Sequence, residues 1–408
     1  MILRARTVVT MDGPPIENGA VRVRGDRILE VGESSQLASS NDEIVDLGEH
    51  ILLPGLINAH CHLDYTCLRG KIAPPQSFAD WIRAINAEKA KLSAEDYVVS
   101  INQGLAEAKQ FGTTAIANLT AFPELIAKTD EPIWAWWFAE LIDVRNRAQN
   151  LTALSRQVSG VNGIVNRALE QLSAANQRGF APHAPFTASA NLYRCCEEIA
   201  QREKIFLTTH LAESREEMQM FREANGPLYD FLKEIGRDMS DCGGTTPLSR
   251  FADLTDASAA QGWIVAHLNE VSETDFDLLR KRKFSIVHCP RSHAYFGHTD
   301  FQFERLRELD FNVCLGTDSL ASNDDLSLFA EMRKFQERFH FEPQKVLEMV
   351  TINPARALKQ RDQLGKIRPS FMANIIALPF TKSPYIFETI LNFVGKVPWI
   401  MLHGRISS

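Results

Sequence analysis

Short β-type runs alternate with longer amphipathic segments through most of the 408-residue chain, and this alternation limits the fold more than any other feature. Repeated βα units of this kind favour a parallel sheet with helices packed on its outside. A closed barrel of such units needs eight strands. Eight runs can be counted, which predicts a (β/α)8 TIM barrel, an α/β fold; they cover residues 55–62, 113–120, 134–142, 179–185, 205–213, 263–269, 284–290 and 312–319.

The two chain ends follow a different pattern. The residues before the first barrel run are short β-type runs separated by turns, and the tail from about Gly365 returns to the same pattern. We therefore expect a small β-sandwich domain built from both termini, comprising residues 1–53 and 360–408. The barrel domain is expected at residues 54–359.

Polar residues gather at the carboxyl ends of the predicted strands, where a TIM barrel places its chemistry. Five of the eight runs end in histidine and one in aspartate, although the chain has only 11 histidines. His60 and His62 are two residues apart, so in a strand both imidazoles point to the same face. A His-x-His pair is weak evidence by itself, but together with the histidines and the aspartate at other strand ends it indicates a metal site. The strand-end residues are His60, His62, Asn118, Glu140, His183, His210, His267, His288 and Asp318.

Histidine and aspartate ligands suit zinc or ferrous iron, and a coordination position left for water makes such a site catalytic. The metal would lower the pKa of the bound water, and a proton shuttle is needed beside it. Glu213, three residues after His210, is the candidate. Its alternative role is an acid at the N-terminus of a helix that begins near Ser214. We favour the catalytic role because of the neighbouring residues.

The formal net charge of −7 provides no basic surface for nucleic acid or anionic lipid, so a small-molecule partner is expected. Seven scattered cysteines, an odd number, do not suggest a disulfide framework and favour a reducing compartment. The sequence contains no stretch that reads as a signal peptide or a membrane span. We therefore expect a cytoplasmic protein that binds neither membrane nor nucleic acid.

Five segments carry a family resemblance: PGLINAHCHLDYTCLRG, HLAES, VAHLN, HCPRSHAYFG and GTDSLASN. In this order, and over nearly the whole chain, they resemble the amidohydrolase superfamily and its branch of aminohydrolases and chlorohydrolases. That branch includes methylthioadenosine and adenosylhomocysteine deaminases, guanine deaminase, aminodeoxyfutalosine deaminase and s-triazine hydrolases. The resemblance implies one divalent metal ion, zinc first and iron as the alternative, since the bridging lysine of binuclear members is missing from GFAPHAPFT. The implied ligands are His60, His62, His210 and Asp318.

The same resemblance implies roles for the residues around the metal. His267 would hydrogen-bond near the attacking water or the substrate, and Glu213 would protonate a ring nitrogen. Asp318 would accept the proton of the water, and His183 would contact the substrate ring. Dimers or larger assemblies are common in the family, so a homo-oligomer is expected.

The chain departs from the family pattern in two places. His293 stands in HCPRSH where many relatives have HCPxSN, which would alter the substrate pocket. The tail reads GKIRPSFMANIIAL instead of a glycine-rich segment, which concerns the small β domain. Phe78 and Trp81, in SFADWI after the first strand, either pack as core or lid or contact an aromatic ring. We include Phe78, Trp81, His183 and His293 as candidate substrate contacts.

The predicted activity is hydrolytic removal of an exocyclic amino group from a nitrogen heterocycle, with release of ammonia. A purine or adenosine-like substrate is preferred, with aminodeoxyfutalosine, adenosylhomocysteine, methylthioadenosine and guanine as candidates. The alternative enzyme is a chlorohydrolase or N-alkylaminohydrolase of triazine-like rings, which would use the same residues. A catalytically silent binding or scaffold barrel is disfavoured, because it predicts loss of a ligand or of Glu213, and all are present.

Overall fold

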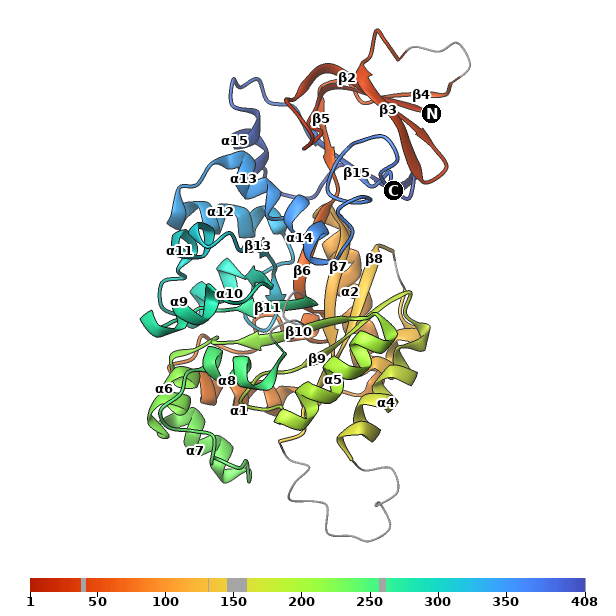
Figure 1. The fold of residues 1–408 in the computed structure, drawn as a ribbon. Helices are drawn as coiled ribbons and strands as arrows, with labels where there is room; N and C mark the ends of the chain where they lie inside the picture. The colour runs from red at the N-terminus through yellow and green to blue at the C-terminus, as the bar shows by residue number, and fades with distance from the viewer. Residues whose placement is uncertain (38–41, 131, 145–159, 257–261, 408) are drawn as a thin grey trace.

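A computed structural model describes residues 1–37, 42–130, 132–144, 160–256 and 262–407. These residues form a large parallel sheet surrounded by helices and a smaller sheet that takes strands from both chain ends (Figure 1). The N- and C-termini both lie at the smaller sheet, at the top of Figure 1. Across the described ranges, every helix is too short or too polar to cross a membrane.

The large sheet is the predicted barrel. Its parallel strands follow one another in chain order from β6 to β13, and a short segment, β14, pairs with β6. Only Gly316 and Thr317 separate β13 from β14, so the two segments form one eighth strand that closes the sheet against the first. Each strand overlaps one predicted run, which confirms the fold class. The strands are β6 (Leu56–His62), β7 (Thr113–Thr120), β8 (Trp134–Leu141), β9 (Gln177–Pro182), β10 (Phe206–Leu211), β11 (Trp263–His267), β12 (Ser285–His288), β13 (Asn312–Leu315) and β14 (Asp318–Ser319).

Helices and 3-10 turns connect the strands around the outside of the barrel. Several begin at a serine or threonine whose side chain accepts a hydrogen bond from the first turn, as Ser77 does for α1 and Thr246 for α8. The longer ones are α1 (Phe78–Lys89), α2 (Ala94–Gln110), α4 (Val161–Gln171), α5 (Ala190–Glu203), α6 (Arg215–Glu223), α7 (Pro227–Glu234), α8 (Pro247–Leu254) and α12 (Leu328–Phe339). The shorter ones are η1 (Leu63–Leu68), η2 (Pro123–Lys128), η3 (Leu172–Ala174), α9 (Glu273–Leu279), α10 (Pro290–Phe296), α11 (Phe303–Glu308), α13 (Pro343–Glu348), α14 (Ile352–Ala357) and α15 (Ile386–Leu391).

The smaller sheet confirms that strands from both termini pair with each other. Its order is β17-β16-β15-β5-β1-β2-β3, with β4 paired to β1, and β15 lies antiparallel to β5. These strands form one hydrogen-bonded sheet, and β5 leads directly into barrel strand β6. The domain boundaries that the sequence suggested stay a prediction. The strands are β1 (Ile2–Val8), β2 (Ile16–Arg24), β3 (Arg27–Glu33), β4 (Ile44–Asp46), β5 (His50–Pro54), β15 (Ile375–Pro379), β16 (Trp399–Leu402) and β17 (Arg405–Ser407).

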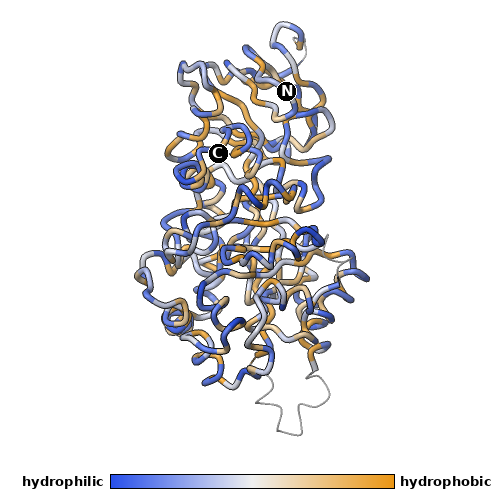
Figure 2. Tube along the Cα trace, turned by 60° about the vertical axis from the view of Figure 1, so that its left-hand side comes forward, coloured by the Kyte–Doolittle hydropathy of each residue, from blue (hydrophilic) through white to orange (hydrophobic). Residues whose placement is uncertain are grey.

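Alternation along the strands separates the inside of the barrel from its helix-covered outside. On β8, Trp136 and Phe138 pack in the apolar cluster inside the barrel, whereas Trp137 packs in the cluster formed with the helices. Cys61 on β6 belongs to the outer cluster as well, which turns its two histidine neighbours inward. Figure 2 shows the apolar stretches concentrated in the middle of the molecule and the polar ones on its outer turns.

Candidate active site

His60 and His62 point into the barrel from the end of β6. Their ring centroids are 5.0 Å apart, and the two residues are only 1% and 8% exposed. Cys61 between them packs against the outer side of the strand, as the two-residue period of a strand requires. The His-x-His spacing therefore brings both imidazoles to one place inside the protein.

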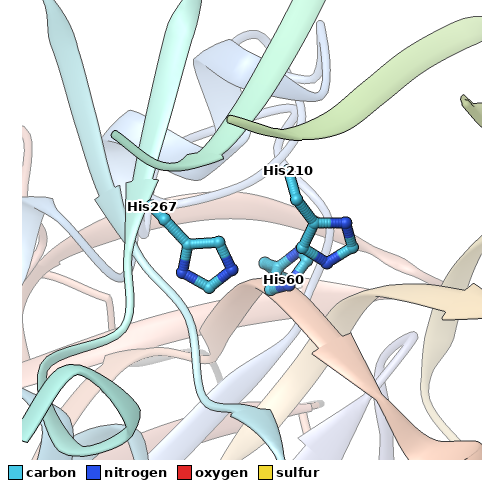
Figure 3. A group of neighbouring side chains, drawn as sticks. All are labelled: His60, His210 and His267. Atoms are coloured by element: carbon cyan, nitrogen blue, oxygen red, sulfur yellow. The ribbon is translucent and has the colours of Figure 1, made fainter. Parts of the chain in front are cut away.

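Three further strand ends meet this pair. The ring centroid of His210 lies 5.1 Å from those of His60 and His62, and the ring of His267 lies 5.6 Å from that of His60. Asp318 Oδ1 lies 3.8 Å from Nε2 of both His60 and His62. Figure 3 shows the side chains of His60, His210 and His267 converging on a common space from three separate strands.

Several nitrogen atoms in this cluster lack the hydrogen-bond partner that a buried imidazole normally has. Within the described residues, neither ring nitrogen of His60 nor Nε2 of His267 has a partner, and Nε2 of His62 faces Nε2 of His210 at 3.1 Å. Overlapping groups of possible ligand atoms, one of them on His60, His62 and Asp318, each lie within 4.8 Å of one another. Imidazole nitrogens with a carboxylate oxygen suit a divalent transition metal. The residues present therefore fit a metal centre.

Burial favours the neutral form of His62 and His210, which is the form that binds a metal. Burial, helped by the neighbouring imidazoles of His60 and His210, lowers the pKa of His62 well below its ordinary value. Burial also lowers the pKa of His210 to about 3. Nδ1 of His210 donates a 2.9 Å hydrogen bond to the carbonyl oxygen of His183, which leaves Nε2 directed at the cluster.

The carboxylate of Asp318 is held by two hydroxyl groups. Ser292 Oγ donates to its Oδ2 at 2.6 Å and Ser322 Oγ donates to the same atom at 3.3 Å, so Oδ1 is directed at His60 and His62. Burial opposes ionisation of Asp318, but the surrounding imidazoles outweigh it and hold its pKa well below the ordinary value. The carboxylate is therefore fixed in orientation, and its lowered pKa favours the ionised form.

The backbone at this end of the barrel is unusual. His267 and Asp318 have φ angles of 73° and 57°, in the left-handed region that residues other than glycine seldom adopt. Strained conformations of this kind cluster at functional sites. Gly316 is required by a close approach, because a Cβ atom there would lie 2.7 Å from the carbonyl oxygen of His60. The eighth strand can thus bring Asp318 up to the first strand.

Glu213 lies beside the cluster, just after β10. Its Oε1 is 3.8 Å from Nε2 of His267, and the residue is 8% exposed. Burial, together with the nearby charges of Asp318 and Glu217, raises the pKa of Glu213 well above its ordinary value. The N-cap of α6 is Ser214, whose side chain accepts from the backbone N–H of Glu217. The side chain of Glu213 is therefore directed to the cluster, and its raised pKa favours the protonated form.

A cavity of about 260 Å³ leads to the cluster. Phe78 and Trp81 from α1 and His183 after β9 line it, so three of the four predicted substrate contacts reach this cavity. The structure does not bring His293 to it. The helix α10 directs His293 toward α12 and a neighbouring cavity, and its Nδ1 contacts Asn269 Oδ1 at 3.1 Å.

Some residues near the site are ones for which the sequence predicted no role. Glu140 was visible only as a strand end; its buried Oε1 lies 3.8 Å from Nδ1 of His62 and has no hydrogen-bond partner among the described residues. Ser292 stood unremarked in HCPRSH. Tyr65 stacks on His62 with 5.9 Å between centroids, and the ammonium group of Lys89 lies 4.7 Å from the Tyr65 centroid. Tyr65 and Lys89 do not stand at the end of a predicted strand, because they reach the site from a 3-10 turn and a helix.

The model of the amidohydrolase family matches residues 51–401. The chain belongs to the amidohydrolase family. It is 26% identical, over 398 residues, to the 5-methylthioadenosine/S-adenosylhomocysteine deaminase of Pyrococcus furiosus, covering 95% of this chain and 88% of that protein. The family and the enzyme class predicted from the motifs, a hydrolase acting on carbon–nitrogen bonds, are confirmed.

Two solved structures share the fold over nearly their whole length. The aminofutalosine deaminase of Helicobacter pylori, in complex with methylthio-coformycin, has a TM-score of 0.85 at 20% identity and covers 100% of both chains. The atrazine chlorohydrolase of Arthrobacter aurescens, complexed with zinc, has a TM-score of 0.82 at 17% identity and covers 99% of this chain and 94% of its own. The predicted branch of the family, which joins deaminases and chlorohydrolases, is the one that these proteins represent.

Proposed function

We propose that the protein is a metal-dependent deaminase that replaces the exocyclic amino group of a purine or adenosine-like ring with oxygen and releases ammonia. The observation that carries this proposal is the convergence of His60, His62, His210 and Asp318 at the inner end of the cavity, beside Glu213, whose raised pKa favours its protonated form. Relatives named for deamination of methylthioadenosine, adenosylhomocysteine and aminofutalosine support the same reaction.

His60, His62, His210 and Asp318 would hold one ion, with zinc favoured and iron as the alternative. The zinc bound by the chlorohydrolase supports the first choice. When bound, the ion supplies a Lewis acid that lowers the pKa of its water toward neutrality. Burial favours neutral imidazoles at His62 and His210, and Ser292 holds the carboxylate of Asp318 in the orientation that this set of ligands needs.

Glu213 and Asp318 divide the proton transfers because burial and neighbouring charges separate their pKa values. Asp318, ionised, accepts a proton from water as the oxygen adds to the amino-bearing ring carbon. The carboxyl group of Glu213 donates its proton to the adjacent ring nitrogen, which gives a tetrahedral carbon. Asp318 then passes the proton it took from water to the amino group, and Glu213 takes the proton of the new hydroxyl group. The bond to the amino group breaks, which releases ammonia, leaves a carbonyl group on the ring and returns both carboxyl groups to their starting forms.

The remaining predicted residues position the reactants. His267, whose Nε2 faces Glu213 Oε1, hydrogen-bonds near the water or the substrate ring. His183, Phe78 and Trp81 line the cavity around the place where the ring would lie. Aromatic walls suit a flat heterocycle, because ring faces stack at little cost in conformational entropy.

A second candidate is hydrolysis of another leaving group, chloride or an alkylamine, from a triazine-like ring. The atrazine chlorohydrolase, which has the same fold, supports this second reaction. The same carboxyl groups would serve both reactions, since the cavity and not the metal selects the leaving group. A cytoplasmic location and a homo-oligomeric state, both expected from the sequence, stay proposals.

The test is product formation by metal-loaded protein with methylthioadenosine, adenosylhomocysteine, aminofutalosine, guanine, an aminotriazine and atrazine. We expect ammonia from an adenosine-like member. Glu213→Gln should lower kcat by about 10²- to 10⁴-fold, because it removes the proton donor, while metal content stays the same. Glu223→Gln, an exposed position of α6, is the matched control. Chloride release without ammonia would favour the second candidate, and an unchanged kcat in Glu213→Gln would refute the mechanism.

A further inference from the structure

One face of α1 forms a wall of the cavity. The residues that line the cavity recur at helical spacing, so they lie along a single face of the helix. The face is apolar over its first turns and becomes polar at its last turn. In chain order, these residues are Phe78, Trp81, Ile82, Ile85, Asn86 and Lys89.

This helix is held in place at its N-terminus. Glu216 of α6 accepts hydrogen bonds from the backbone N–H groups of Phe78 at 2.7 Å and Ala79 at 3.0 Å. The N-terminus of α1 is thereby tied to the helix that follows Glu213. Because the wall is anchored, Asn86 and Lys89 are presented at a defined place and pay less entropy when a ligand binds.

Lys89 lies at the cavity rather than out in solvent. It is half-buried, and its ammonium group sits 4.7 Å from the centroid of the Tyr65 ring, an arrangement that suits a cation. Tyr65 in turn stacks on His62 at 5.9 Å. The contacts of Tyr65 with His62 and with Lys89 connect the metal cluster to the ammonium group. One small molecule can therefore reach both.

The ammonium group of Lys89 faces an aromatic ring and not a carboxylate. Neighbouring basic residues are paired, Arg83 with Asp80 and Lys91 with Glu88, whereas Lys89 makes no ion pair with any carboxylate in the described part of the chain. Among the described residues that line the cavity, it is the one lysine or arginine. A lysine at a helix C-terminus also interacts with the helix dipole, but that role does not require it to face a cavity.

The acidic residues of the cavity lie at its other end. Glu213 and Asp318 belong to the metal cluster, and Glu140 lies beside His62 and His210. Lys89 therefore supplies the positive charge at the outer end of the cavity, where it would attract an anionic group on a ligand. Between the two ends, the wall is lined by aromatic and aliphatic side chains such as Trp81, Ile85 and Phe186.

We propose that Lys89 is a specificity-determining residue that binds an anionic group, a carboxylate or a phosphate, at the end of the substrate away from the reacting amino group. The substrate class is an amino-bearing purine-like ring joined through an apolar arm to one negative charge. This inference rests on the proposed function, because the reacting ring is taken to lie at the metal cluster.

The experiment compares 5′-(3-carboxypropylthio)-5′-deoxyadenosine with its methyl ester, which has the same ring and arm but no charge. Adenosine 5′-monophosphate, with adenosine as its neutral partner, tests phosphate. For each pair, kcat/KM and Kd are measured on the metal-loaded protein. We expect a preference for one anion of about tenfold or more, since a charge-assisted contact is lost in the neutral partner.

Substitutions assign this preference to one side chain. Lys89→Gln should bring the ratio of acid to neutral partner close to one, and Lys89→Arg should keep most of it. Lys91→Gln, an exposed lysine just after α1, should keep the full ratio. The carboxylate and phosphate pairs show which anion the site takes.

The outcomes separate this inference from the proposed function. If the compounds bind but are not deaminated, the proposed function fails for this ring, while the ratio of Kd values still decides the role of Lys89. A ratio near one for both pairs, a ratio that survives in Lys89→Gln, or no measurable binding of either anion overturns the proposal.

Discussion

The inner end of the cavity and its α1 wall are built in different ways. The inner end consists of side chains at the ends of parallel strands, where barrel hydrogen bonds set the backbone and neighbours such as Ser292 hold the side chains. The wall is one face of a single helix, fastened at its N-terminus by Glu216. The proposed chemistry and the proposed substrate contacts thus belong to separate elements, so we expect that the wall can change without disturbing the metal cluster.

The largest effect is expected at the inner end. His210→Asn should remove an imidazole ligand, so that bound metal falls to near zero and activity drops by about 10³-fold or more, several kcal/mol of catalysis being lost. Metal analysis and kcat/KM on the same preparation measure both. His340→Asn, the same change at an exposed position, is the control. Full metal binding in His210→Asn would show that the cluster does not use this strand.

A smaller effect is expected from Glu140, which contacts a proposed ligand without belonging to the proposed set. Its Oε1 lies 3.8 Å from Nδ1 of His62, and we expect it to accept a hydrogen bond from that nitrogen and orient the ring when a metal is bound. Glu140→Gln should therefore weaken metal affinity by about 10- to 100-fold, as loss of such a supporting carboxylate does. Competition with a chelator measures the affinity, with the exposed Glu124→Gln as the control. An unchanged metal affinity would contradict this supporting role and would favour a contact between Glu140 and the substrate.

The smallest effect is expected at the wall. Trp81→Leu keeps the position apolar but removes the aromatic face that packs at 5.0 Å against Phe296 and lines the cavity. We expect KM to rise by about tenfold with kcat changed little, the pattern for a contact made equally in the ground and transition states. A fall in kcat with KM unchanged would contradict the division between chemistry at the strand ends and binding at α1.

The barrel and most of the metal cluster could be predicted because strand periodicity is local. Eight apolar runs indicated the strands, and the two-residue period placed His60 and His62 on one side without knowledge of any partner. The closing strand pairing, and hence the approach of Asp318 to His60, followed from the barrel rule. The position of Glu213 after β10 followed in the same way, although its protonation depends on burial that no motif encodes.

The cavity was less predictable than the cluster. His293, at a motif position where the family pattern varies, points from α10 toward a different cavity. Glu140, Tyr65 and Lys89 reach the site from a strand end, a 3-10 turn and the end of a helix, and no short motif joins them. Their meeting depends on how loops of different lengths pack over the barrel mouth.

The sequence by itself determined the order of strands and helices, the inward direction of the paired histidines and the residue types that suit a metal, because each depends on neighbours within a few positions of the chain. Only the tertiary structure decided the opposite pKa shifts of Glu213 and Asp318, the position of Lys89 at the cavity and the exclusion of His293 from it. Burial and electrostatic interaction act through space, between side chains that lie far apart in the sequence.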